Sequence, residues 1–178
     1  MIKAILACDA FGGIAKDGIM PWPRNMADLN HFKQLTNNTT VVMGRRTWEA
    51  TDMPTPLPNR HNVVVTSDIN YQAAGADIIN DHLSDNLTKL ASSSTVFVIG
   101  GASLFEQLIG DIHILHLTRL TSNYDCDTFL PMDKIAAQFE LIDSVEVDAE
   151  TRFETYFAKR LNDLQIDYRG LQYCNNSD

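Results

Sequence analysis

Hydrophobic residues along this chain follow two patterns, either continuous apolar runs or an apolar residue at every third or fourth position. Short continuous runs rich in β-branched residues are typical of strands buried on both faces of a sheet. Near the end, two longer strands over residues 139–147 and 152–161 are predicted, with the polar turn 148–151 between them. The earlier expected strands cover residues 2–8, 39–43, 62–66, 95–99 and 112–118.

Helical spacing separates most of these strands. Met26, Leu29, Phe32 and Leu35 recur at three-residue intervals, which predicts a helix with Asn25 as its cap. Three further helices are expected: one over residues 47–50, one capped by Ser84 that carries Leu87 and Leu90, and one that carries Leu104, Phe105 and Leu108.

The order of these elements predicts the fold class. Strands alternate with helices and an antiparallel hairpin ends the series, which indicates an α/β fold with a mixed, mostly parallel central sheet flanked by helices. Residues 9–23 hold three glycines and two prolines and are expected to form a long loop. We expect one domain over residues 1–161, followed by a polar, loosely ordered tail over residues 162–178.

Composition and charge narrow the function classes. The chain has 178 residues with 44% hydrophobic and 21% charged side chains, which suits one globular domain. Its net charge of −9 argues against general binding to nucleic acid or to an anionic membrane. Residues 1–60 nevertheless carry 7 basic and 5 acidic side chains, whereas the remainder carries 7 and 18. An anion-binding site is therefore expected in the first third.

The cysteines and histidines point to a reducing compartment and no metal. Three cysteines without regular spacing exclude a disulfide scaffold and a four-thiolate zinc site, and they suit the cytoplasm. Asp9 interrupts the first apolar run too early for a signal peptide, and no stretch approaches the roughly 20 residues of a membrane span. His113 and His116 lie three apart in a predicted strand, where they face opposite sides, so no metal site is expected.

Two junctions between a strand and a helix could bind an anion. In the first, Gly44 is followed by Arg45, Arg46 and Thr47, which offer guanidinium groups and a hydroxyl suited to phosphate. A turn at Gly44 with two solvated arginines explains the same residues. In the second, Gly100-Gly101 follows a strand and lets a ligand approach the backbone, although a tight turn would also need these glycines. The full G-x-G-x-x-G fingerprint is absent.

An acidic residue near the start of the first helix offers a third candidate. Asp28 and Phe32 are four residues apart and share a helix face with Leu29. Burial on such a face raises a carboxylic acid's pKa and suits it to recognise an amidine-like heterocycle. The alternative is that Asp28 simply stabilises the helix N-terminus, where carboxylates are common.

Taken together, these motifs resemble the bacterial, single-domain dihydrofolate reductases. The resemblance extends from residue 1 to about residue 161. It rests on five blocks in the family's order and spacing, none of them specific alone. They are residues 18–22 (GIMPW) with 27–29 (ADL) and 32–33 (FK), residues 42–49 (VMGRRTWE), residues 57–60 (LPNR), residues 98–101 (VIGG) and residues 127–131 (DTFLP).

The resemblance implies reduction of 7,8-dihydrofolate by NADPH, with hydride transfer to pterin C6 and protonation at N5. Asp28 would hydrogen-bond the pterin, Thr118 would accompany it, and Trp22 would hold an ordered water. Arg60 would pair with the glutamate α-carboxylate. The substrate would also contact Ala7, Leu29, Phe32, Leu57 and Ile99.

For the cofactor, the resemblance implies that Ala7, Ile14 and Met20 border the nicotinamide, with the 9–23 loop as a lid. Thr66 and Ser67 would lie at the adenosine 2′-phosphate, and the Gly100-Gly101 peptide would be cis. The remaining NADPH contacts would come from Gly44, Arg45, Arg46, Thr47, Gly100, Gly101, Ala102, Ser103, Leu104 and Phe105. A monomer with these two small-molecule ligands is expected.

The chain departs from the family pattern at Ala15, Ala102, Phe105 and residues 51–56. Asp68 follows Thr66-Ser67, where it could repel a 2′-phosphate or accept a ribose hydroxyl. Two alternatives stay open. One is a pyrimidine reductase of riboflavin synthesis, which shares fold and cofactor, and the other is an inactive binding module. Pro21-Trp22 and the Asp28/Phe32 pair favour folate.

Overall fold

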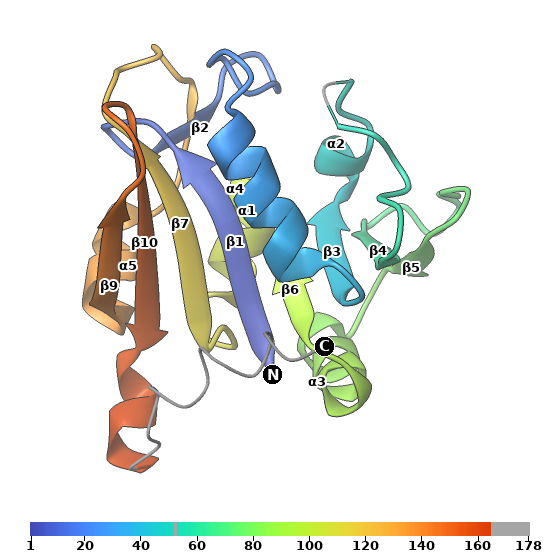
Figure 1. Ribbon diagram of the computed structural model, residues 1–178. Coiled ribbons are helices and arrows are strands. Elements are labelled where there is room, and N and C mark those ends of the chain that lie inside the picture. Colours follow the sequence, from blue (N-terminus) through green and yellow to red (C-terminus); the bar gives the residue numbers. More distant parts are fainter. Residues whose placement is uncertain (52, 165–178) are drawn as a thin grey trace.

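A computed structural model describes residues 1–51 and 53–164, with the backbone alone for residues 162–164. An eight-stranded sheet with the order β5-β4-β3-β6-β1-β7-β10-β9 forms its centre, and a second, two-stranded sheet pairs β2 with β8 (Figure 1). The strands are β1 (Ile2–Cys8), β2 (Gly13–Ala15), β3 (Thr40–Gly44), β4 (His61–Val65), β5 (Asp77–Ile79), β6 (Val96–Val98), β7 (Ile114–Leu120), β8 (Thr128–Phe129), β9 (Phe139–Glu146) and β10 (Thr151–Ala158). The helices are α1 (Met26–Thr36), α2 (Arg45–Trp48), α3 (Leu83–Ser93), α4 (Ala102–Leu108), α5 (Met132–Gln138) and the 3₁₀ helix η1 (Lys159–Leu164).

The sheet is mostly parallel, as predicted. From β5 to β7 every neighbouring pair is parallel, whereas β10 pairs antiparallel with both β7 and β9. Buried apolar residues predominate in the central parallel strands because helices cover both faces of the sheet. The predicted fold class, including the final antiparallel hairpin, is confirmed.

Two apolar clusters lie on the two faces of this sheet. One contains Phe97 and Met43 and packs against Phe32 and Leu35 of α1, which crosses the front of the sheet in Figure 1. The other joins the opposite face to α3, α4 and α5, and Leu87, Phe105 and Ile135 are among its buried residues. Burial of a side chain of this size contributes roughly 1.5–3 kcal/mol relative to exposure.

Several predicted boundaries were wrong. Ser84 does not cap α3: His82 occupies that position with a φ of 45°, and the Ser84 hydroxyl donates to Asp111 Oδ2 at 3.1 Å. The helix expected over residues 47–50 begins at Arg45 instead. The last strand ends at Ala158, because the chain turns into η1, where Arg160 donates to the Ile112 carbonyl at 2.8 Å.

Some elements carried too weak a pattern to be predicted. The strands β2, β5 and β8 have two or three residues each, and α5 has seven. β2 lies within the predicted loop 9–23 and pairs with β8, which ties this loop to the segment after β7. The predicted tail begins within η1, and its residues 165–178 lie outside the described residues.

Candidate active site

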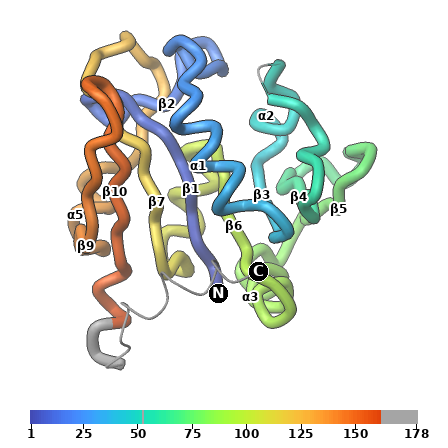
Figure 2. Tube along the Cα trace, viewed as in Figure 1, coloured from blue at the N-terminus to red at the C-terminus, as the bar shows by residue number. Residues whose placement is uncertain are grey.

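The loops that follow β1, β3, β6 and β7 come together at the edge of the sheet where these parallel strands end (Figures 1 and 2). Open α/β sheets bind ligands at this edge. The 9–23 loop, the start of α1, the start of α2 and the Gly100-Gly101 turn all lie there. The three candidate segments from the sequence are therefore brought to one end of the molecule.

Asp28 lies in the first turn of α1, against the sheet. Asn25 caps the helix as predicted, since its Oδ1 accepts the Asp28 N–H at 3.0 Å, and its amide donates to Thr151 Oγ1 on β10 at 2.8 Å. In the described part of the chain, no backbone N–H donates to the Asp28 carboxylate and no basic side chain pairs with it. Burial raises the pKa of Asp28 above its usual value.

Thr118 is a polar neighbour of Asp28. It lies on β7 beside Ala7 of β1 and Phe153 of β10. Its hydroxyl partly offsets the rise in the Asp28 pKa, although Oγ1 has no partner at ordinary hydrogen-bond geometry among the described residues. The Asp28–Thr118 contact therefore does not have the geometry of a full hydrogen bond. A buried hydroxyl left unpaired next to a carboxylate is suited to a polar ligand edge placed between them.

Two histidines lie on the same elements as Asp28 and Thr118, in the layer of side chains between α1 and the sheet. No sequence motif predicted their positions. His31 of α1 stacks on Phe153 with ring centroids 4.0 Å apart, and its edge approaches His116 of β7 at 6.3 Å. Burial lowers the pKa of both, that of His116 to about 3, with Lys3 and then His31 adding repulsion at His116. At neutral pH both rings are uncharged, so Asp28 lies in a layer without a compensating cation.

Trp22 closes this region from the side of the 9–23 loop. Its side chain is buried, and its ring meets that of Tyr124 edge to face, with centroids 5.8 Å apart. Met20 is more exposed, and Ile14 packs against the core. The loop is also held by a hydrogen bond from the Asp17 N–H to Asp127 Oδ2 at 2.7 Å.

The predicted substrate residues further along α1 form a connected group. Arg60 lies over the Phe32 ring, with its guanidinium carbon 5.7 Å from the centroid, and donates to Thr36 Oγ1 at 3.0 Å. Leu57 is buried, and the side chain of Asn62 holds its N–H and its carbonyl at 2.9 Å each. Leu29 is half-buried, and Ile99 is 9% exposed at the end of β6.

Glycines bring the ends of β3 and β6 together. The Gly44 N–H donates to the Gly100 carbonyl at 2.8 Å, and the Gly100-Gly101 peptide is cis, as the resemblance implied. A Cβ on either Gly100 or Gly101 would lie 3.6 Å from the Thr47 hydroxyl. Gly100 also has a φ of +125°, which favours glycine there. Glycine backbone free of side chains, the Thr47 hydroxyl and the exposed Arg46 suit the phosphate groups of a dinucleotide.

Helix α4 follows these glycines. Leu104 and Phe105 are 4% and 0% exposed and belong to the core, so only their backbone could reach a ligand. Ala102 and Ser103 lie in the first turn, where their side chains are less buried.

Arg45 lies in a mixed environment. It pairs with Glu49 at 3.2 Å and with Asp68 at 3.5 Å, and its guanidinium carbon lies 5.2 Å from the centre of the Tyr71 ring. Thr66 is half-buried and Ser67 exposed at the end of β4. Asp68 was anticipated from the sequence, whereas Tyr71 and Glu49 were not. Two carboxylates at Arg45 reduce the positive potential available to a phosphate.

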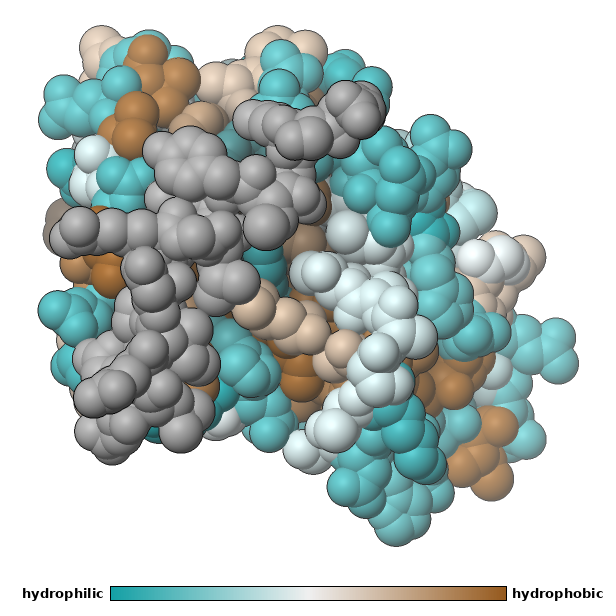
Figure 3. Space-filling view, turned by 60° about the horizontal axis from the view of Figure 1, so that its bottom comes forward, coloured by the Kyte–Doolittle hydropathy of each residue, from teal (hydrophilic) through white to brown (hydrophobic). Residues whose placement is uncertain are grey.

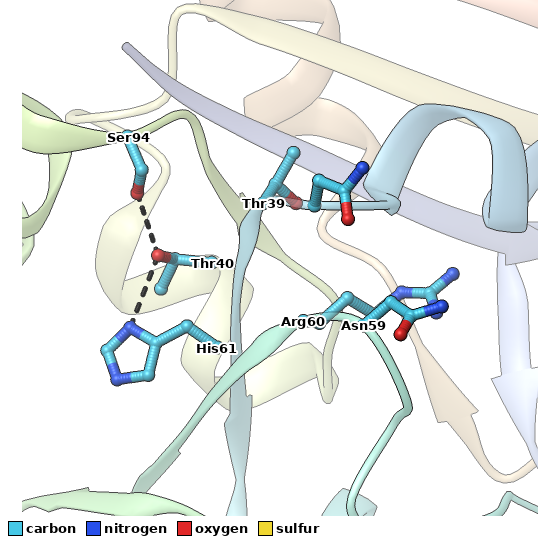
Figure 4. Close-up of a pocket in the computed structure, with 7 residues that line it drawn as sticks. Thr39, Thr40, Asn59, Arg60, His61 and Ser94 are labelled. Carbon is cyan, nitrogen blue, oxygen red and sulfur yellow. Dashed lines mark hydrogen bonds between the residues drawn. The ribbon is translucent and has the colours of Figure 1, made fainter.

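A shallow pocket of about 350 Å³ lies at the opposite edge of the sheet, where β3 and β4 begin. In Figure 4, the Thr40 hydroxyl bridges Ser94 Oγ at 2.7 Å and His61 Nδ1 at 3.3 Å. This triad-like arrangement is not suited to nucleophilic attack, because Thr40 is 2% exposed. In the coloured part of this face, hydrophilic side chains alternate with smaller apolar patches (Figure 3).

The described residues offer no group of three or more His, Cys, Asp or Glu side chains arranged to hold a metal ion. Nor does any helix in residues 1–51 and 53–164 have the length and apolar character needed to cross a bilayer.

Comparison with known proteins assigns the family. The dihydrofolate reductase family model matches residues 1–161. The chain is 35% identical over 130 residues to the dihydrofolate reductase of Staphylococcus aureus, covering 73% of this chain and 77% of that protein. It is 36% identical over 147 residues to the bifunctional dihydrofolate reductase-thymidylate synthase of Glycine max, covering 72% of this chain and 28% of that longer protein.

A solved structure agrees. The dihydrofolate reductase of Enterococcus faecalis, complexed with NADP(H) and RAB-propyl, superposes with a TM-score of 0.79 at 34% identity, covering 89% of this chain and 96% of that one. The family match over residues 1–161 includes both glycine-linked strands, the acid of α1 and the final hairpin. This chain belongs to the dihydrofolate reductase family.

Proposed function

We propose that this protein reduces 7,8-dihydrofolate to 5,6,7,8-tetrahydrofolate with NADPH, and that Asp28 binds the pterin and assists protonation of N5. The observation that carries the proposal is the half-buried Asp28 carboxylate beside the unpaired Thr118 hydroxyl. A planar heterocycle edge with adjacent N–H groups satisfies both at once. Bound NADPH supplies the hydride.

The residues around Asp28 orient the substrate and exclude water. Ala7 and Thr118 are neighbours on β1 and β7, so the small side chain of Ala7 leaves room for a ring beside the acid. Phe32 and Leu57 offer apolar contacts further along α1, and Arg60 offers a guanidinium for a carboxylate at the far end of the substrate. Holding both reactants in a fixed orientation lowers the barrier by removing translational and rotational freedom.

The raised pKa of Asp28 suits it to assist protonation of the substrate. Burial disfavours its charged form, so the carboxylate gains stability from an N–H-bearing ring and increases the proton affinity of that ring. In this proposal, the buried Trp22 holds a water that delivers the proton.

On the cofactor side, we assign the nicotinamide end to Ala7, Ile14 and Met20 and the phosphates to Gly44, Arg46, Thr47, Gly100 and Gly101. The close approach of backbone at Gly44 and Gly100, together with the Thr47 hydroxyl, supports this assignment. Arg45, Thr66 and Ser67 would face the 2′-phosphate. The carboxylates of Glu49 and Asp68 at Arg45 moderate that interaction.

The test is Asp28→Asn, with NADPH oxidation measured on addition of dihydrofolate. We expect turnover near pH 7 to fall by roughly 100-fold or more, since general acid–base assistance contributes about 10²–10⁴-fold. The Kd for NADPH should stay within about twofold, because no residue assigned to the cofactor changes.

Asp133→Asn is the matched control, since Asp133 lies in the first turn of α5 and is exposed. If both variants lose similar thermal stability and keep full turnover, Asp28 only stabilises its helix and the proposed role is wrong. Inhibition of the wild type by an antifolate separates a folate reductase from a pyrimidine reductase.

A further inference from the structure

Asp9 is a fully buried carboxylate at the end of β1, outside the group of residues that the site uses. Its Oδ1 accepts the N–H groups of Phe11 at 2.9 Å and Gly13 at 2.8 Å. Its Oδ2 accepts the N–H of Tyr124 at 3.2 Å, from a residue 115 positions away. Among the described residues, no basic side chain forms an ion pair with it.

These bonds join two segments of the chain. Phe11 and Gly13 belong to the 9–23 loop, and Tyr124 belongs to the 121–127 segment after β7. The segments also meet at Gly13, where a Cβ would lie 2.4 Å from Cys126 Cβ. The packing at Gly13 leaves no room for a side chain, so the distance between the segments is fixed where Asp9 binds both.

Cys126 lies close to Asp9, since both line the space beside Gly13. Burial together with the negative charge of Asp9 raises the pKa of the Cys126 thiol to about 11, so the thiol stays protonated. The three backbone N–H groups and the thiol outweigh the desolvation of Asp9, and the pKa of its carboxyl is lowered below the usual value.

Tyr124 connects this anchor to the site. Its backbone N–H is held by Asp9, and its ring meets the buried Trp22 edge to face with centroids 5.8 Å apart. Trp22 lies on the same 9–23 loop, 13 positions after Asp9. The start of the loop is therefore bound to the Asp9 carboxylate directly, and its end is linked to the same carboxylate through Tyr124.

We infer that Asp9 is a positioning residue for the reaction: through Tyr124 it fixes Trp22 and the closing position of the 9–23 loop over the reacting rings. The kinetic consequence of this inference rests on the proposed function, whereas the effect of Asp9 on the position of Trp22 does not.

The experiment replaces Asp9 by Asn in a Trp48→Phe background, which leaves Trp22 as the sole tryptophan of the chain. The amide oxygen of Asn still accepts from Phe11 and Gly13, whereas its NH₂ group cannot accept from Tyr124. We expect acrylamide quenching of Trp22 to rise roughly twofold or more, and kcat/KM for dihydrofolate to fall roughly 10-fold or more. The KM for NADPH should change by less than about twofold.

Asp148→Asn is the matched control, because Asp148 accepts the Glu150 N–H at 2.9 Å in the β9–β10 turn, another loop held by a carboxylate. It should change neither quenching nor kcat/KM. A lower Tm of Asp9→Asn with unchanged quenching and unchanged kcat/KM shows a merely structural role and overturns the inference.

Two further outcomes keep the tests separate. If the wild type does not reduce dihydrofolate, the proposed function fails, and Trp22 quenching in Asp9→Asn still decides the positioning role. If Asp9→Asn does not fold, Tyr124→Leu replaces it. Increased quenching of Trp22 there supports the connection through Tyr124, and unchanged quenching overturns it.

Discussion

Removal of His116 should make this protein less sensitive to acid. His116 lies on β7 between α1 and the sheet, its Nε2 has no hydrogen-bond partner among the described residues, and its pKa falls to about 3. Burial is the main cause, and the charges of Lys3 and His31 add to it. The folded protein therefore keeps this ring neutral over a range of pH in which the unfolded chain protonates it.

The size of the effect follows from proton linkage. In the unfolded chain, where the pKa of a histidine has its ordinary value of 6.5, the ring is protonated as pH falls below that value, while the folded state stays neutral down to about pH 3. The unfolded state thus binds more protons in this window, so stability falls as pH falls. At about pH 5 the loss from His116 is about 2 kcal/mol relative to about pH 8. The figure hardly changes for any folded-state pKa below about 4, because the native ring is then neutral at about pH 5.

The assay is urea unfolding of the wild type and His116→Phe at about pH 8 and about pH 5, followed by circular dichroism. Phenylalanine keeps a ring between His31 and Phe97. Buried carboxylates lower stability in acid in both proteins, so the relevant quantity is the difference between the two pH effects. We expect the wild type to lose about 2 kcal/mol more than the variant.

His82→Phe is the control, since the His82 side chain is 76% exposed and its removal relieves no burial. It should leave the pH effect as in the wild type. Equal losses in the wild type and His116→Phe would refute the reasoning, because they would mean that the folded state accommodates a protonated His116.

Two other substitutions test the substrate and cofactor ends of the site. Asn62→Ala should lower the free energy of unfolding, measured with urea, by about 1–3 kcal/mol, because the buried Leu57 N–H loses the partner that holds it at 2.9 Å. It should also raise the KM for dihydrofolate, since Leu57 lies near Arg60, whereas Asn86→Ala, which removes exposed hydrogen bonds in α3, should change neither quantity. Asp68→Asn should raise the preference for NADPH, measured as the kcat/KM with NADPH divided by the kcat/KM with NADH, roughly 3- to 10-fold, because it removes a negative charge 3.5 Å from Arg45. An unchanged ratio would show that Arg45 does not contact the 2′-phosphate.

The sequence was most informative where burial on both faces demands continuous apolar residues. Buried apolar side chains dominate segments such as 2–8 and 39–43, so their pattern identifies a central parallel strand. The two- and three-residue strands β2 and β5 form because neighbouring segments supply partners, a long-range cause that leaves no local pattern. The misplaced cap of α3 has a similar origin: Ser84 has the preferred side chain for a cap, but its hydroxyl bonds to Asp111 in the loop before β7.

The residues of the candidate site also divide into those that the sequence could predict and those that it could not. Motifs marked Asp28, Gly44 and Gly100 because chemistry or backbone geometry demands those residue types locally. The layer of His31, His116 and Phe153 could not be predicted, since its rings come from α1, β7 and β10 and meet only in the folded sheet.

That unpredicted layer has a consequence for the predicted acid. A buried carboxylate is usually accompanied by a cation or by several N–H donors, as Asp9 is by its N–H groups and Glu154 by Arg119 and Arg152. Asp28 has neither among the described residues, and the two histidines nearest in its layer are kept neutral by burial. The protein therefore satisfies the charge of Asp9 and of Glu154, whereas Asp28 of α1 has no such partner among the described residues, which supports the ligand-binding role that we propose for it. That contrast separates a binding carboxylate from a structural one more sharply than its place in the first turn of a helix does.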